Sequence, residues 1–366
     1  MGGAPRSVGS QTHTRVREPW VPGHVRSVGV WARYALGCRT EERMAVTTAL
    51  TISDRLERVL PDAEIAALTP LIAEIEALKV ERNAVVLAHN YMTPDIYHGV
   101  ADLSGDSLAL AHMAAKTDAE VIVMAGVHFM AETAKLVSPD KTVLIPDLGA
   151  GCSLADSITP DDIALLRERY PDAAVVTYVN TSAAVKAACD ITCTSGNAVQ
   201  IVESLDADQI IFLPDQYLGR WVAGQTEKEL ILWQGSCEVH ERFTAEELRQ
   251  YRVDFPGIQI IAHPECPQDV LAEADFVGST SGMIDWVTDN KPDRVVMVTE
   301  CSMSDNVAAV SPDTEFVRPC NLCPYMKMIT LEGIRDSLRD LKHEVVIPSE
   351  VADGARRAID RMLALG

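Results

Sequence analysis

Three cysteines stand at nearly equal intervals along the chain. Cys152, Cys237 and Cys323 are 85 and 86 residues apart, and each follows the third of three apolar, strand-like runs in its own third of the sequence. A fold built from three repeats would bring one thiolate per repeat to a common point. Soft thiolate ligands select iron–sulfur clusters or zinc. The spacing alone also allows the bland interpretation of three unrelated buried cysteines, because free cysteine is often a core residue.

Other cysteines have less distinctive settings. Cys320 and Cys323 form a CxxC pair, which alone is typical of a redox pair or of half a zinc site. A full zinc site would need a second CxxC or CxxH nearby, and the sequence has none there. Cys189 and Cys193 lie in an apolar, Ala-rich stretch, where we expect buried core side chains.

Acid–base side chains follow two matched strand-like runs. His89 and Tyr91 come at the end of one run, and His263 and Glu265 come at the end of another. Ligands of parallel sheets bind beyond the carboxyl ends of strands, so we expect these four residues in one site. Histidine titrates near neutrality, and burial can tune a glutamate. His240, three residues after one of the spaced cysteines, is either a neighbour of the metal group or an ordinary buried histidine.

Hydroxyl side chains occupy matching positions in the three repeats. Ser107, Ser195 and Thr280 lie at predicted helix N-termini, 15–18 residues after the first strand-like run of each set. Backbone N–H groups and the helix dipole favour anions there. Ordinary N-capping explains any one of these residues equally well. Three at matching positions favour binding of a carboxylate or phosphate.

The elements that must position these residues form three similar sets of apolar, β-branched runs. The runs are Ala84–His89, Val121–Val127 and Thr142–Pro146, then Ala174–Val179, Gln209–Leu213 and Glu229–Trp233, then Ile258–Ala262, Asp275–Gly278 and Arg294–Thr299. Continuous apolar runs that alternate with helical stretches indicate parallel strands covered on both faces. We therefore predict an α/β fold of three similar three-layer αβα domains with short parallel sheets and a site at their common interface.

The predicted domains have approximate boundaries. The first unit covers residues 46–150, the second 151–235 and the third 236–330. The segment 331–366 reads as a helix, a short strand at Glu344–Ile347 and a second helix, and we expect it to pack on the first unit. Leu56–Leu78 predicts one or two helices broken near Pro61 and Pro70.

The first 45 residues differ from the rest. Residues 1–43 contain seven arginines, no lysine and three acidic residues, with weak periodicity. Transit peptides have this Arg-rich, acid-poor character. We prefer the interpretation of a disordered extension, with Met44 as a candidate initiator.

Bulk composition narrows the class of protein. The 366 residues carry a formal net charge of −21, which argues against a nucleic-acid binder or a partner of anionic membranes. The longest apolar runs, such as Val121–Val127, are too short to span a bilayer. Nine cysteines without a secretory signal pattern favour a reducing compartment, so we expect a cytoplasmic protein with metal or redox cysteines.

Taken together, these motifs resemble the quinolinate synthase family over about residues 55–360. The motifs, in family order, are His89-Asn90-Tyr91, Gly105-Asp106-Ser107, Gly126–Lys135, Ala150-Gly151-Cys152, Tyr178-Val179-Asn180, Thr194–Ala198, Leu213-Pro214-Asp215, His263–Cys266, Ser279–Met283 and Cys323–Met326. The resemblance implies three α/β domains around a pseudo-threefold axis, with one 4Fe–4S cluster at the centre. It also implies that Cys152, Cys237 and Cys323 ligate that cluster and that Cys320 is a bystander.

The resemblance further implies a reaction. Iminoaspartate would condense with dihydroxyacetone phosphate to give quinolinate, with loss of phosphate and two waters, and an L-aspartate oxidase or dehydrogenase would supply the iminoaspartate. Residues matching the family's substrate-contacting positions are His89, Ser107, Tyr178, Asn180, Ser195, His263, Glu265 and Thr280. Tyr91 and Glu265 are our choices for proton transfer, with His89 and His263 positioning or polarising the substrates.

Three other interpretations remain open from the residues themselves. The first is an iron–sulfur hydro-lyase acting on another small dicarboxylate. The second is a non-enzymatic iron–sulfur sensor, which would need a basic effector or nucleic-acid surface that the sequence does not show. The third is a structural zinc site.

Overall fold

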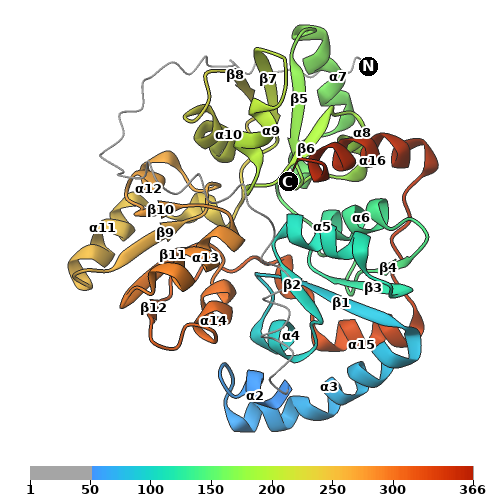
Figure 1. Ribbon diagram of the computed structural model, residues 1–366, viewed down its shortest axis with the longest axis vertical. Coiled ribbons are helices and arrows are strands. Elements are labelled where there is room, and N and C mark those ends of the chain that lie inside the picture. The colour runs from blue at the N-terminus through green and yellow to red at the C-terminus, as the bar shows by residue number, and fades with distance from the viewer. Residues whose placement is uncertain (1–51, 366) are drawn as a thin grey trace, which may run out of the picture.

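The computed structural model describes residues 52–365, and the predicted extension at 1–45 lies outside the described residues. Within that range the chain forms three four-stranded sheets in which every pair of neighbouring strands is parallel. All three sheets have the same order, in which the second strand of the set is followed by the first, the third and the fourth. Figure 1 shows the sheets grouped around the middle of the molecule. The predicted α/β class with parallel sheets is confirmed.

The first sheet forms from the most apolar run of the chain. Its strands are β1 (Ala84–His89), β2 (Leu103–Gly105), β3 (Val121–Ala125) and β4 (Thr142–Leu144). Every residue of β3, and every residue of β1 after Ala84, is buried, as expected for a sheet covered on both faces. The covering helices are α3 (Asp62–Arg82), α4 (Pro94–Gly99), α5 (Ser107–Lys116) and α6 (His128–Val137), with the short α2 (Ile52–Leu56) packed on α4.

The second and third sheets repeat this plan. The second contains β5 (Ala174–Tyr178), β6 (Ile191–Cys193), β7 (Gln209–Leu213) and β8 (Glu229–Leu232), with helices α7 (Pro160–Arg169), α8 (Ala183–Ala187), α9 (Ala198–Glu203) and α10 (Gln216–Ala223). The third contains β9 (Gln259–Ala262), β10 (Phe276–Val277), β11 (Arg294–Val298) and β12 (Glu315–Val317), with helices α11 (Ala245–Asp254), α12 (Gln268–Ala272), α13 (Thr280–Asn290) and α14 (Ser302–Ala308). Repetition of strand order and helix placement gives each sheet a similar set of loops at its carboxyl edge.

Two helices follow the third sheet and return to the other two. Helix α15 (Leu331–Asp340) packs against α3 and β3 of the first sheet, whereas α16 (Ser349–Leu363) packs mainly on α8 and β6 of the second and also on α6. Figure 1 shows α16 lying beside α8. The prediction that the whole segment 331–366 packs on the first unit therefore needs correction, because the apolar face of α16 covers the second sheet as well.

Three further expectations differ from the structure. Pro70 does not break a helix, since α3 continues through it, and its exposed position lets water satisfy the carbonyl that loses a hydrogen bond. The predicted strand at Glu344–Ile347 is a single antiparallel bridge between Glu344 and Leu144. The strands β2, β6 and β12 were not predicted, because none of them belongs to a continuous apolar run, unlike the equally short β4. Among residues 52–365, no helix is long and apolar enough to cross a membrane.

Candidate active site

A cavity of about 710 Å³, measured to include its open mouth, is lined by loops that follow strands of all three sheets. All twelve residues predicted for the site line it. They are His89, Tyr91, Ser107, Cys152, Tyr178, Asn180, Ser195, Cys237, His263, Glu265, Thr280 and Cys323. The structure thus brings the twelve side chains to one place, while the role of each stays a prediction.

The three spaced cysteines sit in loops of the same local design. Each follows the fourth strand of its sheet, and a 3₁₀ turn begins three residues later, at Ala155–Ser157, His240–Arg242 and Met326–Met328. Each cysteine carbonyl accepts a hydrogen bond from the backbone N–H four residues on, at 3.0, 3.0 and 3.2 Å. Seven residues after each cysteine a threonine, Thr159, Thr244 or Thr330, caps the next helix. The recurring spacing Cys-x₆-Thr is therefore a further sequence signal of these loops, although the three cysteines were predicted without it.

This design aims backbone donors at each sulfur. In every loop the N–H groups two and three residues after the cysteine hydrogen-bond its thiol. Burial nevertheless dominates and raises the pKa of all three thiols, that of Cys152 to about 12. Without a cation the sulfurs are therefore neutral at pH 7, whereas a bound metal would deprotonate them and the N–H groups would then stabilise the thiolates.

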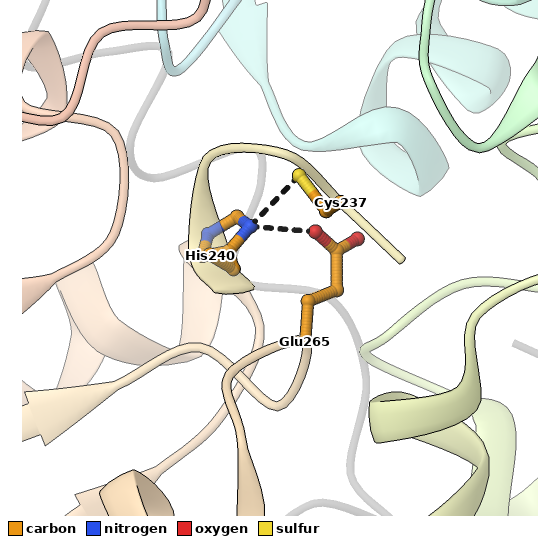
Figure 2. Close-up of side chains that lie close together, drawn as sticks. All are labelled: Cys237, His240 and Glu265. Carbon is orange, nitrogen blue, oxygen red and sulfur yellow. Dashed lines mark hydrogen bonds and ion pairs between the residues drawn. The ribbon is translucent and has the colours of Figure 1, made fainter. Parts of the chain in front are cut away.

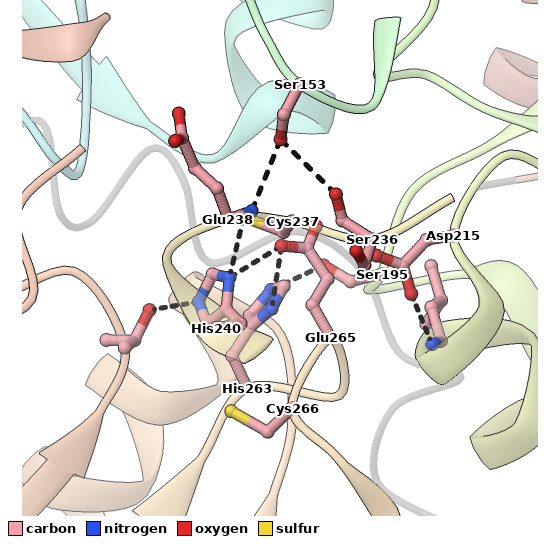
Figure 3. Close-up of polar contacts among 12 residues, drawn as sticks. Ser153, Ser195, Asp215, Ser236, Cys237, Glu238, His240, His263, Glu265 and Cys266 are labelled. Atoms are coloured by element: carbon pink, nitrogen blue, oxygen red, sulfur yellow. Dashed lines mark hydrogen bonds and ion pairs between the residues drawn. The ribbon is translucent and has the colours of Figure 1, made fainter. Parts of the chain in front are cut away.

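A direct contact joins two of the cysteine loops. The Ser153 hydroxyl accepts a hydrogen bond from the Glu238 N–H at 3.2 Å and donates one to the Ser236 carbonyl at 3.3 Å, as Figure 3 shows. These two residues flank Cys237, and Ser153 follows Cys152. The contact therefore fixes one thiol relative to another across two units of the chain.

Glu265 is the buried charge of the site. Its carboxylate accepts a hydrogen bond from His240 Nδ1 at 2.7 Å and another from the Tyr178 hydroxyl, and His263 Nδ1 lies 3.8 Å away. Burial alone would raise the pKa of Glu265, but the nearby His240 and His263 outweigh it and bring this pKa to about 2. Figures 2 and 3 show the carboxylate pointing at the His240 ring, and Figure 3 also shows the His263 ring that stacks on His240. Glu265 is thus ionised at neutral pH and able to accept a proton.

A continuous chain of hydrogen bonds connects this carboxylate to Tyr91. The Tyr91 hydroxyl lies 2.6 Å from Thr299 Oγ1, which in turn lies 2.9 Å from His240 Nε2. Because His240 Nδ1 donates to Glu265, its Nε2 is the acceptor for Thr299, and Thr299 accepts from Tyr91. Burial raises the pKa of Tyr91 well above 10, so the hydroxyl keeps its proton at neutral pH. Protons can therefore pass between Tyr91 and Glu265 through Thr299 and His240.

His89 is a neutral donor. Its Nδ1 accepts the Tyr91 N–H at 3.2 Å, so the hydrogen of the ring resides on Nε2. Burial lowers the pKa of His89 to about 3 despite the charge of Glu265. The ring therefore offers an N–H to a ligand without carrying a positive charge.

Two of the three predicted hydroxyl positions are at helix starts. Ser107 and Thr280 are the first residues of α5 and α13, capped by Asp106 and Ser279. Ser195 is not, because α9 begins at Ala198, and its hydroxyl instead lies 3.2 Å from His263 Nε2. The prediction for Ser195 was wrong about the helix because the chain forms an additional turn at Thr194–Asn197.

Some polar atoms of the cavity have no partner among the described residues. Asn180 Oδ1 and His263 Nδ1 are both buried, line the cavity and make no hydrogen bond. Buried polar groups are rarely left unsatisfied, so these atoms mark where a polar ligand or water binds. The cavity lining includes no lysine or arginine from residues 52–365, so a bound anion would rely on neutral donors and helix starts.

Comparisons with known proteins place the chain in a family. The family model described as quinolinate synthetase A protein matches residues 73–364. The chain is 60% identical over 316 residues to "Quinolinate synthase 1" of Mesorhizobium japonicum, covering 86% of this chain and 98% of that protein. It is 60% identical over 318 residues to "Quinolinate synthase" of Agrobacterium fabrum, covering 87% and 92%, and 61% identical over 294 residues to that of Xylella fastidiosa strain 9a5c, covering 80% and 87%.

The chain belongs to the quinolinate synthase family. This confirms the resemblance stated from its motifs, and it makes the chain an enzyme of NAD biosynthesis. The described part of this family member offers two candidate sets of metal ligands that share Cys237. One is the three cysteines of the repeated loops. The other is Cys237, His240 and Glu265, whose donor atoms lie within 4.8 Å of one another (Figure 2).

The chemistry of the donors favours the three cysteines. His240 Nδ1 is 2.7 Å from the Glu265 carboxylate and 3.2 Å from Cys237 Sγ, so its hydrogen is already used within the second set. The three cysteines instead come from matching loops, line one cavity and receive backbone donors at each sulfur. They fit a soft metal group that takes three thiolates from the protein.

Several residues that support the site of this quinolinate synthase family member were not predicted from the sequence. Thr299 and Glu300 directly follow β11, so the strand-end rule could have found them. Lys327 belongs to the 3₁₀ turn after Cys323 and gave no signal in the sequence. Cys320, considered with Cys323 as a CxxC pair, has Cys301 as its neighbour instead, with 3.9 Å between the two sulfurs.

Proposed function

We propose that the chain condenses iminoaspartate with dihydroxyacetone phosphate to quinolinate, with loss of phosphate and two waters. The observation that carries the proposal is the convergence of twelve predicted residues from three sheets on one cavity, in a chain of the quinolinate synthase family. We further propose that the three units, 46–150, 151–235 and 236–330, are related by a pseudo-threefold axis that passes near the cavity.

The cofactor of the proposal is one 4Fe–4S cluster held by Cys152, Cys237 and Cys323. When bound by these three residues, the cluster would supply Lewis-acid chemistry toward substrate oxygens, which would lower the barrier for loss of hydroxide. The matching loops support this choice, because each presents one half-buried cysteine whose sulfur has two backbone donors.

The side chains of the cavity perform the proton transfers. Glu265 is ionised and takes a proton from substrate carbon or nitrogen, whereas Tyr91 holds its proton and delivers it to a departing oxygen. The hydrogen-bond chain through Thr299 and His240 returns the proton from Glu265 to Tyr91 between steps. His89 polarises a substrate oxygen through its Nε2–H.

Neutral donors hold the anionic substrates. The starts of α5 and α13 offer Ser107, Thr280 and backbone N–H groups to carboxylate or phosphate oxygens. His263 Nδ1 and Asn180 Oδ1, which make no hydrogen bond among the described residues, take up the remaining polar groups of the substrate. His263, Ser195 and Tyr178 thereby complete the predicted substrate-binding set.

The proposed setting is the cytoplasm. The nine cysteines support a reducing compartment. The net charge of −21 argues against a nucleic-acid or membrane partner. An L-aspartate oxidase or dehydrogenase is the enzyme that would supply iminoaspartate.

The test is an anaerobic assay of the cluster-reconstituted protein with both substrates, in which quinolinate is measured by chromatography. We expect product only when both substrates are present, and the metal-free protein serves as the control. An intact cluster without quinolinate formation would contradict the proposal and favour a hydro-lyase acting on another small dicarboxylate. A colourless protein that binds zinc would contradict the cofactor.

A further inference from the structure

In the loop that carries Tyr91, the backbone N–H groups bond within the first unit, whereas the backbone carbonyls are held by side chains of the third unit. Residues 90–92 follow β1, and their three successive carbonyls accept hydrogen bonds from two side chains. Asn306 Nδ2 donates to the Asn90 carbonyl at 3.1 Å and to the Met92 carbonyl at 2.8 Å. Lys327 Nζ donates to the Tyr91 carbonyl at 2.9 Å. More than 210 residues of sequence separate donors and acceptors.

Lys327 is itself held in place by a buried acid. Its ammonium group lies 2.9 Å from Glu300 Oε1 and 2.7 Å from Ser302 Oγ, in addition to the Tyr91 carbonyl. An ammonium group has three hydrogens, so these three acceptors satisfy it completely. The Glu300 side chain is fully buried and the Lys327 side chain is 21% exposed, so solvent screens the attraction between their charges only weakly.

The same pair reaches one of the proposed cluster ligands. Glu300 Oε1 accepts the backbone N–H of Cys323 at 3.4 Å, and the Lys327 N–H donates to the Cys323 carbonyl at 3.2 Å. Neither Glu300, Lys327 nor Asn306 lines the cavity. These residues therefore act on the site through the groups that they hold.

We propose that Lys327 and Asn306 form a carbonyl clamp, defined by these two residues, that positions Tyr91 against Thr299 and the cavity. The inference rests on the proposed function for the role of Tyr91, and it adds two positioning residues to the site. Glu300 anchors the clamp and links it to the Cys323 loop. A clamp of this kind sets the location of a reacting hydroxyl without touching the substrate.

Loss of the clamp should reduce turnover more than substrate binding. In Lys327→Met the Tyr91 carbonyl loses its donor and the loop relaxes, so the Tyr91 hydroxyl moves from its 2.6 Å contact with Thr299. A displacement of about 1 Å in a reacting group can lower kcat about 10²-fold. The KM values should stay near those of the wild type, since Ser107, Thr280 and Asn180 are untouched.

The experiment compares anaerobically reconstituted wild type, Lys327→Met, Lys327→Arg and the control Lys116→Met, which changes an exposed lysine at the end of α5. Turnover is expressed per iron-loaded enzyme, and amide hydrogen exchange is followed in residues 89–93 and, as an internal reference, in 174–178. We expect Lys327→Met to lose about 10²-fold in kcat and to exchange faster only in residues 89–93. Lys327→Arg should recover most of the turnover, and Lys116→Met should match the wild type.

Lys327→Met has two effects: it removes the donor to the Tyr91 carbonyl, and it leaves the buried Glu300 carboxylate without an ion-pair partner. A double variant distinguishes them. Lys327→Met with Glu300→Gln removes both charges, so it should fold and load iron like the wild type while keeping the loss of kcat and the fast exchange. Recovery of wild-type turnover in the double variant would overturn the clamp, as would unchanged exchange in residues 89–93. A wild type that forms no quinolinate would instead count against the proposed function, and the exchange measurement would still decide whether the clamp exists.

Discussion

At the scale of single residues, the three spaced cysteines of the cavity have matching surroundings. Each is half-buried, each receives two backbone N–H groups, and each belongs to a loop with the same turn and the same capping threonine. Since the three loops are equivalent, removal of any one thiol should leave a metal group with two protein ligands instead of three.

Replacement of Cys152, Cys237 or Cys323 by Ala should therefore abolish both cluster and activity in each case. The measurements are iron and acid-labile sulfide per chain, the visible absorption band and anaerobic turnover. Cys189→Ala and Cys193→Ala are matched controls, because both thiols are buried in the core around the second sheet. Each control should keep the cluster at a stability cost of about 1 kcal/mol.

One outcome would contradict the three-thiol site directly. A Cys152→Ala protein that keeps a full metal load would favour the alternative set of Cys237, His240 and Glu265. An intact cluster in Cys237→Ala would contradict both sets.

Residue types and strand ends predicted most of the site, and three-dimensional contacts supplied the rest. His89, His263 and Glu265 were found because they follow long apolar runs whose carboxyl ends must meet. Lys327 could not be found in this way, because its importance comes from a contact with a carbonyl 236 residues away. His240 was left undecided, and its place between Cys237, Glu265 and Thr299 depends on the register of two loops.

At the scale of elements, the presence of an apolar run decided which strands could be predicted, since the short β4 and β10 were found as well. The runs Ala84–His89 and Gln209–Leu213 became β1 and β7 with the predicted bounds, because each is mainly apolar and is flanked by Asn, Asp or Pro, which strands disfavour. The strands β2, β6 and β12 have no recognisable apolar pattern in the sequence. They form because each pairs in parallel with a longer neighbouring strand. Pro70 inside α3 shows packing of Ile72 and Ile75 overriding a local preference.

Helix α4 carries a buried histidine that makes the stability of the fold depend on pH. Burial lowers the pKa of His98 from 6.5 to about 4, and the nearby Arg55 and Arg58 contribute to this shift. The unfolded chain then binds a proton that the folded chain resists, so stability is complete above pH 6.5 and is lost as the pH falls toward 4. The full effect is about 3 kcal/mol.

Replacement His98→Gln should reduce this dependence. The free energy of unfolding in urea, measured between pH 7.5 and 4.5, should fall less steeply for the variant than for the wild type. His128→Gln, at a side chain that is 42% exposed, controls for the loss of an imidazole. Parallel curves for wild type and His98→Gln would show that α4 does not contribute to the acid sensitivity.

At the scale of the whole molecule, α16 joins parts of the chain that are far apart in sequence. Arg356 donates to the Leu136 carbonyl of α6 at 2.9 Å, and Thr192 of β6 donates to the Ala358 carbonyl at 3.2 Å. Gly354 allows the close approach to α8, because a Cβ there would lie 3.0 Å from Ala187 Cβ and 3.1 Å from Ala187 Cα. The helix thus holds the first and second sheets together at a distance from the cavity.

A larger side chain at this contact should weaken the assembly of the two sheets. Gly354→Leu should lower the free energy of unfolding by about 1–3 kcal/mol through overpacking, with little change in KM because no residue of α16 lines the cavity. Asp360→Leu, on the exposed side of the same helix, is the matched control and should have a small effect. Equal stabilities of the two variants in chemical denaturation would contradict the close packing of α16 on α8.

The equal spacing of the cysteines has a consequence for how the protein is made. Cys152 and Cys323 are 171 residues apart, so the first thiol leaves the ribosome long before the third is synthesised. A nascent chain that ends before residue 323 has at most two of the three sulfurs, although its first two sheets already have all their strands. On the proposed ligand set, such a chain lacks the third thiolate, so the cluster can be completed only after translation has passed the third loop.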